Sequence, residues 1–200
     1  MKIYACTDMH SDFNILRKIK QNVKRLDPDF VVCAGDYTNF DKNVEKVLSF
    51  FNSMGKPVAI IHGNHEEEGL SEKICSKLKN VYFVHQGFVE LGEVIICGYG
   101  GGGFNYEYPE LTAFQEHPKF KKLIKGKKLV FLNHAPPYGT ELDKLPNKRH
   151  CGSKTLVRFI KKVKPIIVFT GHIHPHFGKE VKIGDTRVVN PGPEGRLFIV

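Results

Sequence analysis

Five apolar stretches of this chain end in residues of the types that bind metal ions. They lead into Asp8 and His10, Asp36, Asn64 and His65, His134, and His172 and His174. In an open α/β sheet, binding sites form outside the carboxyl ends of the strands. Asp, Asn and His offer oxygen and nitrogen donors without thiolate, which suits Mn, Fe, Zn, Co or Ni. The set exceeds the needs of one tetrahedral ion and matches two ions that share a carboxylate, a centre suited to displacement at phosphorus.

Strands and helices are expected to alternate along the first 90 residues. Predicted strands are the run up to Asp8, 30–34, 58–61 and 81–84. Apolar residues recur at helical spacing from Phe13 to Leu26 and from Val44 to Met54, and a short helix is predicted at 71–79. This order is typical of a parallel sheet with crossover helices.

The second half of the chain predicts a more mixed structure. The expected elements are a hairpin with its turn at Gly92-Glu93, a helix around 110–124, a strand at 128–133, a helix at 154–163 capped by Ser153, a strand at 166–170 and short antiparallel strands in the tail. Residues 134–153 contain three prolines and little periodicity, and a loop this long is usually functional or mobile. No repeat or linker is visible, so residues 1–200 are predicted to form one domain.

The positive charge of the chain is concentrated in one segment. The formal net charge is +9, and residues 119–164 hold 14 Lys and Arg against only Glu141 and Asp143, a net of +12. This segment brackets His134, where it would attract anionic substrates. The alternative is a solvated, lysine-rich helical face.

The cysteines and the hydropathy indicate a reducing compartment and no membrane. The five cysteines are an odd number without a C-x-x-C pair, and Cys6, Cys33 and Cys97 lie in apolar runs, which predicts buried free thiols. The first residues form a predicted strand and do not resemble a signal peptide, and no apolar run reaches membrane-spanning length. A cytoplasmic location is therefore expected.

Taken in order, the motifs resemble the signature of calcineurin-like metallophosphoesterases. They are Asp8-Met9-His10, Gly35-Asp36, Gly63-Asn64-His65-Glu66, His134 and Gly171-His172-Ile173-His174. Residues 133–140 and the NPGP turn at 190–193 further resemble the small prokaryotic Icc-related phosphoesterases. The resemblance implies a four-layer α-β-β-α sandwich of two mixed sheets, with a dinuclear metal site at the carboxyl ends of the strands.

The same resemblance implies a role for each residue. Asp8, His10, Asp36 and His174 would hold one metal ion, and Asp36, as the bridge, would join Asn64, His134 and His172 around the other. The cofactors would be two divalent or transition metal ions (Mn, Fe, Zn, Ni or Co). A hydroxide between them would attack phosphorus. His65 is not expected to be a ligand and would protonate or stabilise the leaving oxygen.

Asn39 departs from the pattern that the resemblance implies. Many members of the family read G-D-x-x-D, in which the second Asp supports the catalytic His, whereas this chain has Asn39 there. Asn can orient an imidazole but cannot balance its positive charge, so His65 is predicted to be less readily protonated than in relatives with the Asp. Asp41, Glu66 or Glu68 would be the substitutes.

The remaining histidines are not expected to bind the metal ions. His62 is predicted to lie in the core or beside the site, and His85, His117 and His176 on the surface or in loops. His150, beside Arg149 in the long loop, either reaches a substrate phosphate or has no role in binding.

Gly98, Gly100 and Gly103 fit the G-x-G-x-x-G dinucleotide fingerprint. No helix is predicted to start directly after them, so the glycines are expected instead to let the backbone approach the substrate or pack tightly. Nearby aromatic residues would either stack on a base or pack over the mouth of the site; they are Tyr99, Phe104, Tyr106 and Tyr108.

The leading functional prediction is a dinuclear-metal-dependent phosphohydrolase that cleaves a phosphodiester or a small phosphorylated metabolite such as a nucleotide. The alternatives are a nuclease on single-stranded nucleic acid, which the basic segment favours, and a non-catalytic metal-binding scaffold. Retention of His65 beside a full ligand set favours the enzyme. No membrane partner is expected, and the oligomeric state stays open.

Overall fold

Two mixed β-sheets form the centre of the molecule in the computed structural model, which describes residues 1–200. The first sheet has the strand order β11-β1-β2-β3-β4: β11 (Arg196–Ile199), β1 (Lys2–Cys6), β2 (Phe30–Cys33), β3 (Val58–Ile60) and β4 (Val81–Phe83). The second has the order β5-β6-β7-β8-β10-β9: β5 (Phe88–Leu91), β6 (Val94–Tyr99), β7 (Lys128–Asn133), β8 (Ile167–Phe169), β10 (Thr186–Val189) and β9 (Glu180–Ile183).

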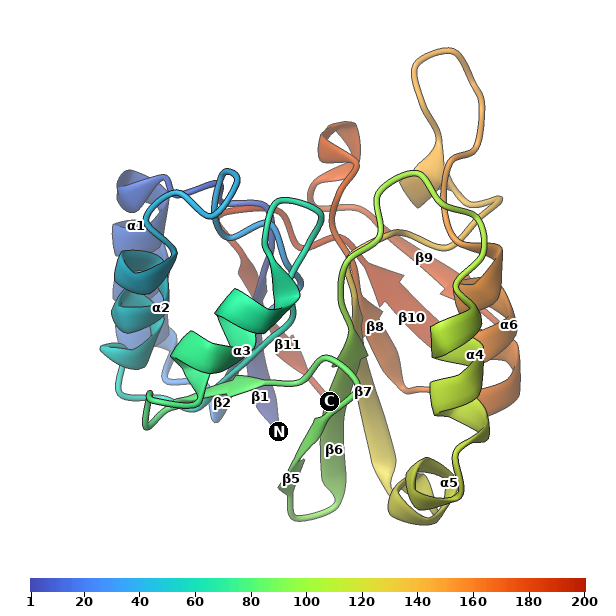
Figure 1. Cartoon of the computed structure of the whole chain (residues 1–200), viewed down its shortest axis with the longest axis horizontal. Coiled ribbons are helices and arrows are strands. Elements are labelled where there is room, and N and C mark those ends of the chain that lie inside the picture. Colours follow the sequence, from blue (N-terminus) through green and yellow to red (C-terminus); the bar gives the residue numbers. More distant parts are fainter.

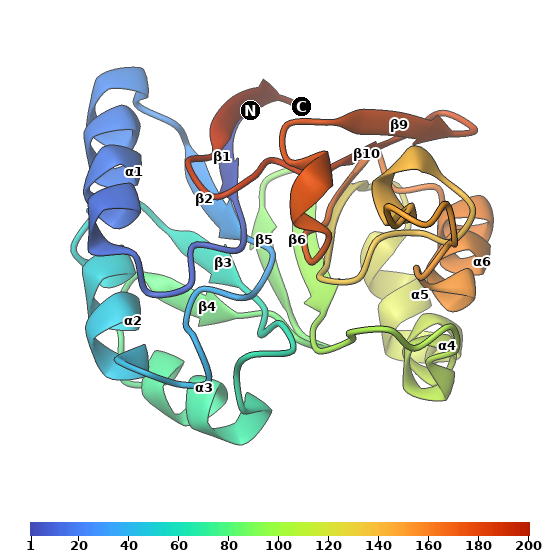
Figure 2. The ribbon, with the colours of Figure 1, turned by 90° about the horizontal axis from the view of Figure 1, so that it is seen from above.

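Helices cover the outer face of each sheet. On the first sheet lie α1 (Phe13–Leu26), α2 (Val44–Asn52) and α3 (Glu68–Cys75), and on the second lie α4 (Pro109–Glu116), α5 (Pro118–Ile124) and α6 (Lys154–Val163). Figures 1 and 2 show the resulting order of helices, sheet, sheet and helices. The predicted four-layer α-β-β-α sandwich is thereby confirmed.

Successive side chains of a strand point to opposite faces of its sheet, and in this molecule both faces are buried. In β1, Ile3 and Ala5 point into the core between the sheets, whereas Tyr4 and Cys6 point into the core beneath α1 and α2. A third apolar cluster fills the space between the second sheet and helices α4 to α6. Strands buried on both faces read as continuous apolar runs, which is the pattern that the sequence shows.

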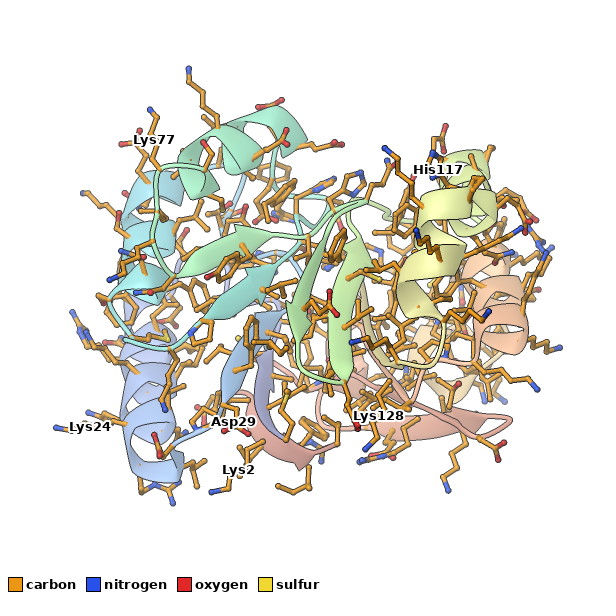
Figure 3. The ribbon with its side chains drawn as sticks, turned by 90° about the horizontal axis from the view of Figure 1, so that it is seen from below. Lys2, Lys24, Asp29, Lys77, His117 and Lys128 are labelled. Atoms are coloured by element: carbon orange, nitrogen blue, oxygen red, sulfur yellow. The ribbon has the colours of Figure 1, made fainter.

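Parallel pairing places the ends of the key strands together. β1, β2, β3 and β4 pair in parallel, as do β6, β7, β8 and β10. Figure 3 views the end where Lys2 and Lys128, the first residues of β1 and β7, lie. The carboxyl ends of these strands therefore gather at the opposite end of the molecule, where all the candidate ligands follow.

Two helix predictions were wrong in their boundaries. The predicted helix at 71–79 is α3, which starts earlier because the Glu67 side chain accepts hydrogen bonds from the backbone N–H groups of Gly69 and Leu70. The predicted helix at 110–124 is divided into α4 and α5 at His117, because Pro118 lacks the N–H that a continuous helix needs.

The long loop at 134–153 is ordered around one buried carboxylate. Asp143, in the 3₁₀ turn η1 (Glu141–Asp143), is fully buried. Its oxygens accept hydrogen bonds from the backbone N–H groups of Gly139, Thr140 and Gly152 and contact Nδ1 of His150 at 2.8 Å. Nδ1 of His150 is thus held inside the loop.

Much of the basic segment lies on the outer helical layer. Lys121 of α5 and Lys162 of α6 both contact Glu116, and Arg158 contacts Glu107. For these residues the structure favours the solvated helical face over a cationic zone at the candidate ligands.

The cysteines of this protein do not form disulfide bonds. All five cysteines are free and buried, which confirms the prediction for Cys6, Cys33 and Cys97. No helix has the length and apolar character that crossing a membrane requires.

Candidate metal centre

Two clusters of metal-capable side chains meet at the carboxyl ends of the strands. Asp8, His10 and His174 form one, and Asp36, His134 and His172 form the other, with the potential ligand atoms of each cluster within 4.8 Å of one another. Oδ2 of Asp36 lies 3.9 Å from Nε2 of His10 and 3.3 Å from Nε2 of His134, so Asp36 stands between the clusters. The Asn64 side-chain oxygen lies 3.2 Å from Nε2 of His134. The structure thus brings together all seven residues predicted as ligands.

Left-handed backbone shapes the loops that carry these side chains. Asp8, His10, Asp36 and His172 have φ angles of 55°, 46°, 48° and 70°. Such values are uncommon for residues other than glycine and tend to occur at functional sites. All four residues lie in the short loops that follow β1, β2 and β8.

Hydrogen bonds to backbone carbonyls orient two of the imidazoles. Nδ1 of His10 contacts the Thr38 carbonyl oxygen at 3.1 Å, and Nδ1 of His134 contacts the Ala34 carbonyl oxygen at 2.8 Å. A carbonyl only accepts, so in each ring Nδ1 carries the proton and the neutral ring offers Nε2 as a ligand. Nε2 of His172 is buried and has no hydrogen-bond partner. A buried polar nitrogen without a partner fits a position that a metal ion fills.

Asp36 and His134 shift each other's pKa values. Burial opposes the ionisation of Asp36, but His134 and the His65 backbone N–H outweigh it and lower its pKa to about 2. Burial also disfavours a charged His134, yet the carboxylates of Asp36 and Asp8 raise its pKa to about 9. The carboxylates therefore attract positive charge strongly enough to keep a fully buried imidazole protonated when no metal ion is bound.

Glu66 is the functional residue whose role sequence reasoning missed. It is buried, and its two oxygens accept four hydrogen bonds from the loops that carry Asp36 and Asn64. Oε2 accepts from the backbone N–H groups of Asp36 (3.0 Å) and Gly63 (2.7 Å), and Oε1 accepts from the backbone N–H (2.7 Å) and hydroxyl (2.9 Å) of Thr38. Burial and the Asp36 charge raise the pKa of Glu66 to about 7, whereas the hydrogen bonds from Gly63 and Thr38 favour the ionised form.

None of the residues considered as a support for His65 contacts its imidazole. Asn39 is exposed, and Glu66 binds the backbone donors. Asp41 accepts from the Glu67 N–H instead, and Glu68 lies beside His62 and His85. Nδ1 of His65 is buried without a hydrogen-bond partner. Nε2 of His65 lies 3.9 Å from Oδ2 of Asp36, so this ring borders the centre without the expected hydrogen bond behind it.

Glycines in the motifs leave room for the ligands. A Cβ atom on Gly63 would overlap the Asp36 carboxylate and backbone, and one on Gly171 would overlap the Thr7 hydroxyl and the Asp8 carboxylate. The Thr7 hydroxyl donates to Asp8 at 2.7 Å, and the His172 N–H donates to the same carboxylate at 3.1 Å. Close approach at Gly171 thus holds Asp8 between two donors.

We expect Gly171→Ala to displace Asp8 and to reduce metal binding about 10- to 100-fold, the usual effect of disturbing residues that orient a ligand. Isothermal titration of the metal-free protein measures this. Gly87→Ala is the matched control, since a Cβ there would meet its nearest neighbour, the Phe83 carbonyl oxygen, at 3.5 Å. Equal metal affinity in the two variants would contradict the assigned packing.

Two histidines predicted to lie on the surface or in loops do lie in connecting segments, but their side chains are largely buried. His176 is 7% exposed, with Nε2 2.7 Å from the Lys144 carbonyl oxygen. The His85 side chain is 6% exposed and lies near His62 and Glu68, with which it forms a further possible ligand cluster. However, the Gly100 N–H donates to Nδ1 of His85 at 2.7 Å. Nε2 of His85 lies 3.5 Å from Oε1 of Glu68 and 3.0 Å from the side-chain nitrogen of Gln86. Both ring nitrogens of His85 therefore have partners within the protein.

The glycine-rich stretch packs against the core and does not start a helix. A Cβ on Gly98 would clash with Ile61 and Leu132, and one on Gly100 with the His62 ring. α4 begins only at Pro109. Tight packing, one of the two predicted roles, is therefore confirmed, and the dinucleotide fingerprint is excluded. Tyr99 and Tyr108 are buried, whereas Phe104 and Tyr106 are exposed.

The fold and the cluster define a metal-dependent hydrolase of phosphate esters, and the comparisons with known proteins agree. The sequence matches the calcineurin-like phosphoesterase family over residues 1–176, so the chain belongs to that family. No curated protein matches the sequence.

Several solved structures share the fold. TT1561 of Thermus thermophilus is 18% identical, with a TM-score of 0.79 over 96% of this chain and 88% of that one. The phosphopantetheinyl hydrolase of Mycobacterium tuberculosis is 13% identical (TM-score 0.67; 96% and 88% covered). A dimetal phosphatase from Danio rerio is 10% identical (TM-score 0.64; 94% and 86% covered).

Proposed function

We propose that this protein is a dinuclear-metal-dependent phosphohydrolase that cleaves a phosphodiester or a small phosphorylated metabolite. The observation that carries the proposal is the position of Asp36 between two ligand clusters. Asp8, His10 and His174 would hold one ion, and His134, His172 and Asn64 the other, with Asp36 shared. The donors suit Mn, Fe, Zn, Ni or Co. The names of the dimetal phosphatase and the phosphopantetheinyl hydrolase support hydrolysis at phosphorus as the reaction.

Each side chain then has a defined task. When bound, the two ions would neutralise the phosphate and generate the attacking hydroxide at neutral pH. His174 and Asn64 are exposed, so a phosphate ester can reach the centre from solvent. His65 presents Nε2 at the border of the centre, where its proton would pass to the leaving oxygen. Five buried free thiols support the cytoplasm as the compartment.

His65 lies close enough to His10 and Asp36 to be a metal ligand itself. One variant distinguishes the role of a ligand from that of a proton donor. We expect His65→Ala to lower kcat about 10²- to 10⁴-fold, the usual contribution of a general acid, while two ions per chain remain bound. The measurement is a screen of model monoesters, model diesters, cyclic nucleotides and single-stranded RNA with each metal, with metal content determined in parallel.

His117→Asn serves as the control, because His117 is exposed and caps α5, a task that Asn also performs. Loss of one ion in His65→Ala would make His65 a ligand. If the unsubstituted protein turned over no ester with any of the metals, the scaffold alternative would replace the enzyme. Turnover of RNA alone would favour the nuclease.

A further inference from the structure

Two exposed phenylalanines lie directly on imidazoles of the metal centre. Phe40 is 74% exposed and its ring centroid lies 4.3 Å from that of His65, with the ring planes inclined by 30°. Phe104 is 63% exposed and its centroid lies 4.7 Å from that of His172. Each ring is thus held against an imidazole of the site and remains open to solvent.

The Phe40 loop is held in place. Phe40 has a φ of 50°, a left-handed conformation that a bulky residue rarely adopts. The N–H of the next residue, Asp41, donates to the His65 carbonyl oxygen at 3.1 Å, and the Asp41 carboxylate accepts from the Glu67 N–H at 3.2 Å. The backbone that carries the Phe40 ring is therefore tied to the segment that carries His65.

Phe104 reaches the centre from the other sheet. It follows Gly103, where an added Cβ would lie 3.9 Å from the Cβ of Asn64. The loop after β6 thus passes over Asn64 and places the Phe104 ring against His172. Since His65 and His172 each border the Asp36 carboxylate, each phenylalanine is separated from Asp36 by one imidazole ring.

We propose that Phe40 and Phe104 bind the organic group of the substrate and select phosphate esters that carry a planar heteroaromatic group, as in nucleotides. The inference rests on the proposed function, because the metal centre would hold the phosphate beside the imidazoles that the two rings contact. Aromatic rings accept any flat heteroaromatic face by stacking, whereas a sugar or alkyl group offers no such face. The chemistry therefore points to a nucleobase.

The test compares two ligands that differ only in the base. These are the 5′-phosphonate analogues of adenosine and of ribose, in which carbon replaces the scissile ester oxygen, so that neither is hydrolysed. Calorimetric titration of the metal-loaded protein gives both dissociation constants. We expect the adenosine analogue to bind at least about tenfold more tightly than the ribose analogue, as stacking of one base predicts.

Three variants locate the preference. In Phe40→Ala/Phe104→Ala the ratio of the two dissociation constants should fall to about one, and Phe40→Tyr/Phe104→Tyr should retain it, because the rings remain. Phe88→Ala removes a ring that is 55% exposed on β5 and should also retain the ratio. Metal content and circular dichroism establish that each variant is folded.

The outcomes separate this inference from the proposed function. A ratio near one in the unsubstituted protein, or a ratio retained without the two rings, overturns the inference; the second result would mean that the rings only cover the imidazoles. If the ratio of the two dissociation constants depends on the rings but the protein hydrolyses no ester, the proposed function is overturned. The nucleobase site would then remain as a binding site.

Discussion

Asp36→Asn is expected to lower kcat/KM by more than about 10³-fold, because loss of a single charge-stabilising contact alone costs about 10²- to 10³-fold and Asp36 serves both proposed ions. The metal content should fall from two ions per chain to one or none. The fold should persist, since Asn retains a side-chain oxygen to accept from the His65 N–H, which Oδ1 of Asp36 does at 3.1 Å. Steady-state kinetics and elemental analysis of the same preparation measure both effects.

Asp185→Asn makes the same chemical change at an exposed position between β9 and β10 and should leave both quantities unchanged. Two tightly bound ions in Asp36→Asn would contradict the shared position of Asp36. Loss of activity with both ions retained would restrict Asp36 to a role in the chemical step.

Glu66→Gln is expected to lower the free energy of unfolding of the metal-free protein by about 3 kcal/mol or more. Each oxygen of Glu66 accepts two donors, so the amide nitrogen of Gln necessarily faces two donors that it cannot satisfy. Hydrogen bonds to a charged group contribute about 1.5–3 kcal/mol each, and Glu66 is charged at pH values above its pKa of about 7, where the comparison is made. Urea unfolding with linear extrapolation measures the change. Metal affinity should fall as well, because the Asp36 and Gly63 backbone is no longer held.

The matched control is Glu72→Gln, an exposed residue of α3, for which a change within about 0.5 kcal/mol is expected. A Glu66→Gln protein as stable as the unsubstituted one would mean that the four hydrogen bonds are replaced by water. In that case the loops would not depend on Glu66 for their shape.

The strand ends could be predicted from the sequence because apolar runs and the residues that follow them are local signals. A run such as residues 166–170 followed by Gly171 and His172 identifies both the strand and the ligand type. The three-dimensional grouping follows from parallel pairing, which the alternation of elements predicts.

Features that depend on contacts between distant loops were not predictable in this way. Glu66 follows His65 directly, and nothing local shows that its carboxylate turns away from His65 toward the backbone of Asp36 and Thr38. The hydrogen bond that the Gly100 N–H donates to Nδ1 of His85 likewise joins residues 15 positions apart. The break before Pro118, by contrast, has a local signal in the proline itself, which the prediction of one helix around 110–124 did not take into account.

Neither sheet carries a complete set of ligands. The first supplies Asp8, His10, Asp36 and Asn64, and the second supplies His134, His172 and His174. The separation of the two proposed ions is therefore set by how closely the sheets approach, and this depends on the volume of side chains such as Val32, Ile61 and Leu132 in the core between them. Interior packing is dense and transmits strain, so a methyl group added or removed in this layer would change the spacing of the metal ions. Selection for altered turnover would therefore act on hydrophobic residues that never meet the substrate.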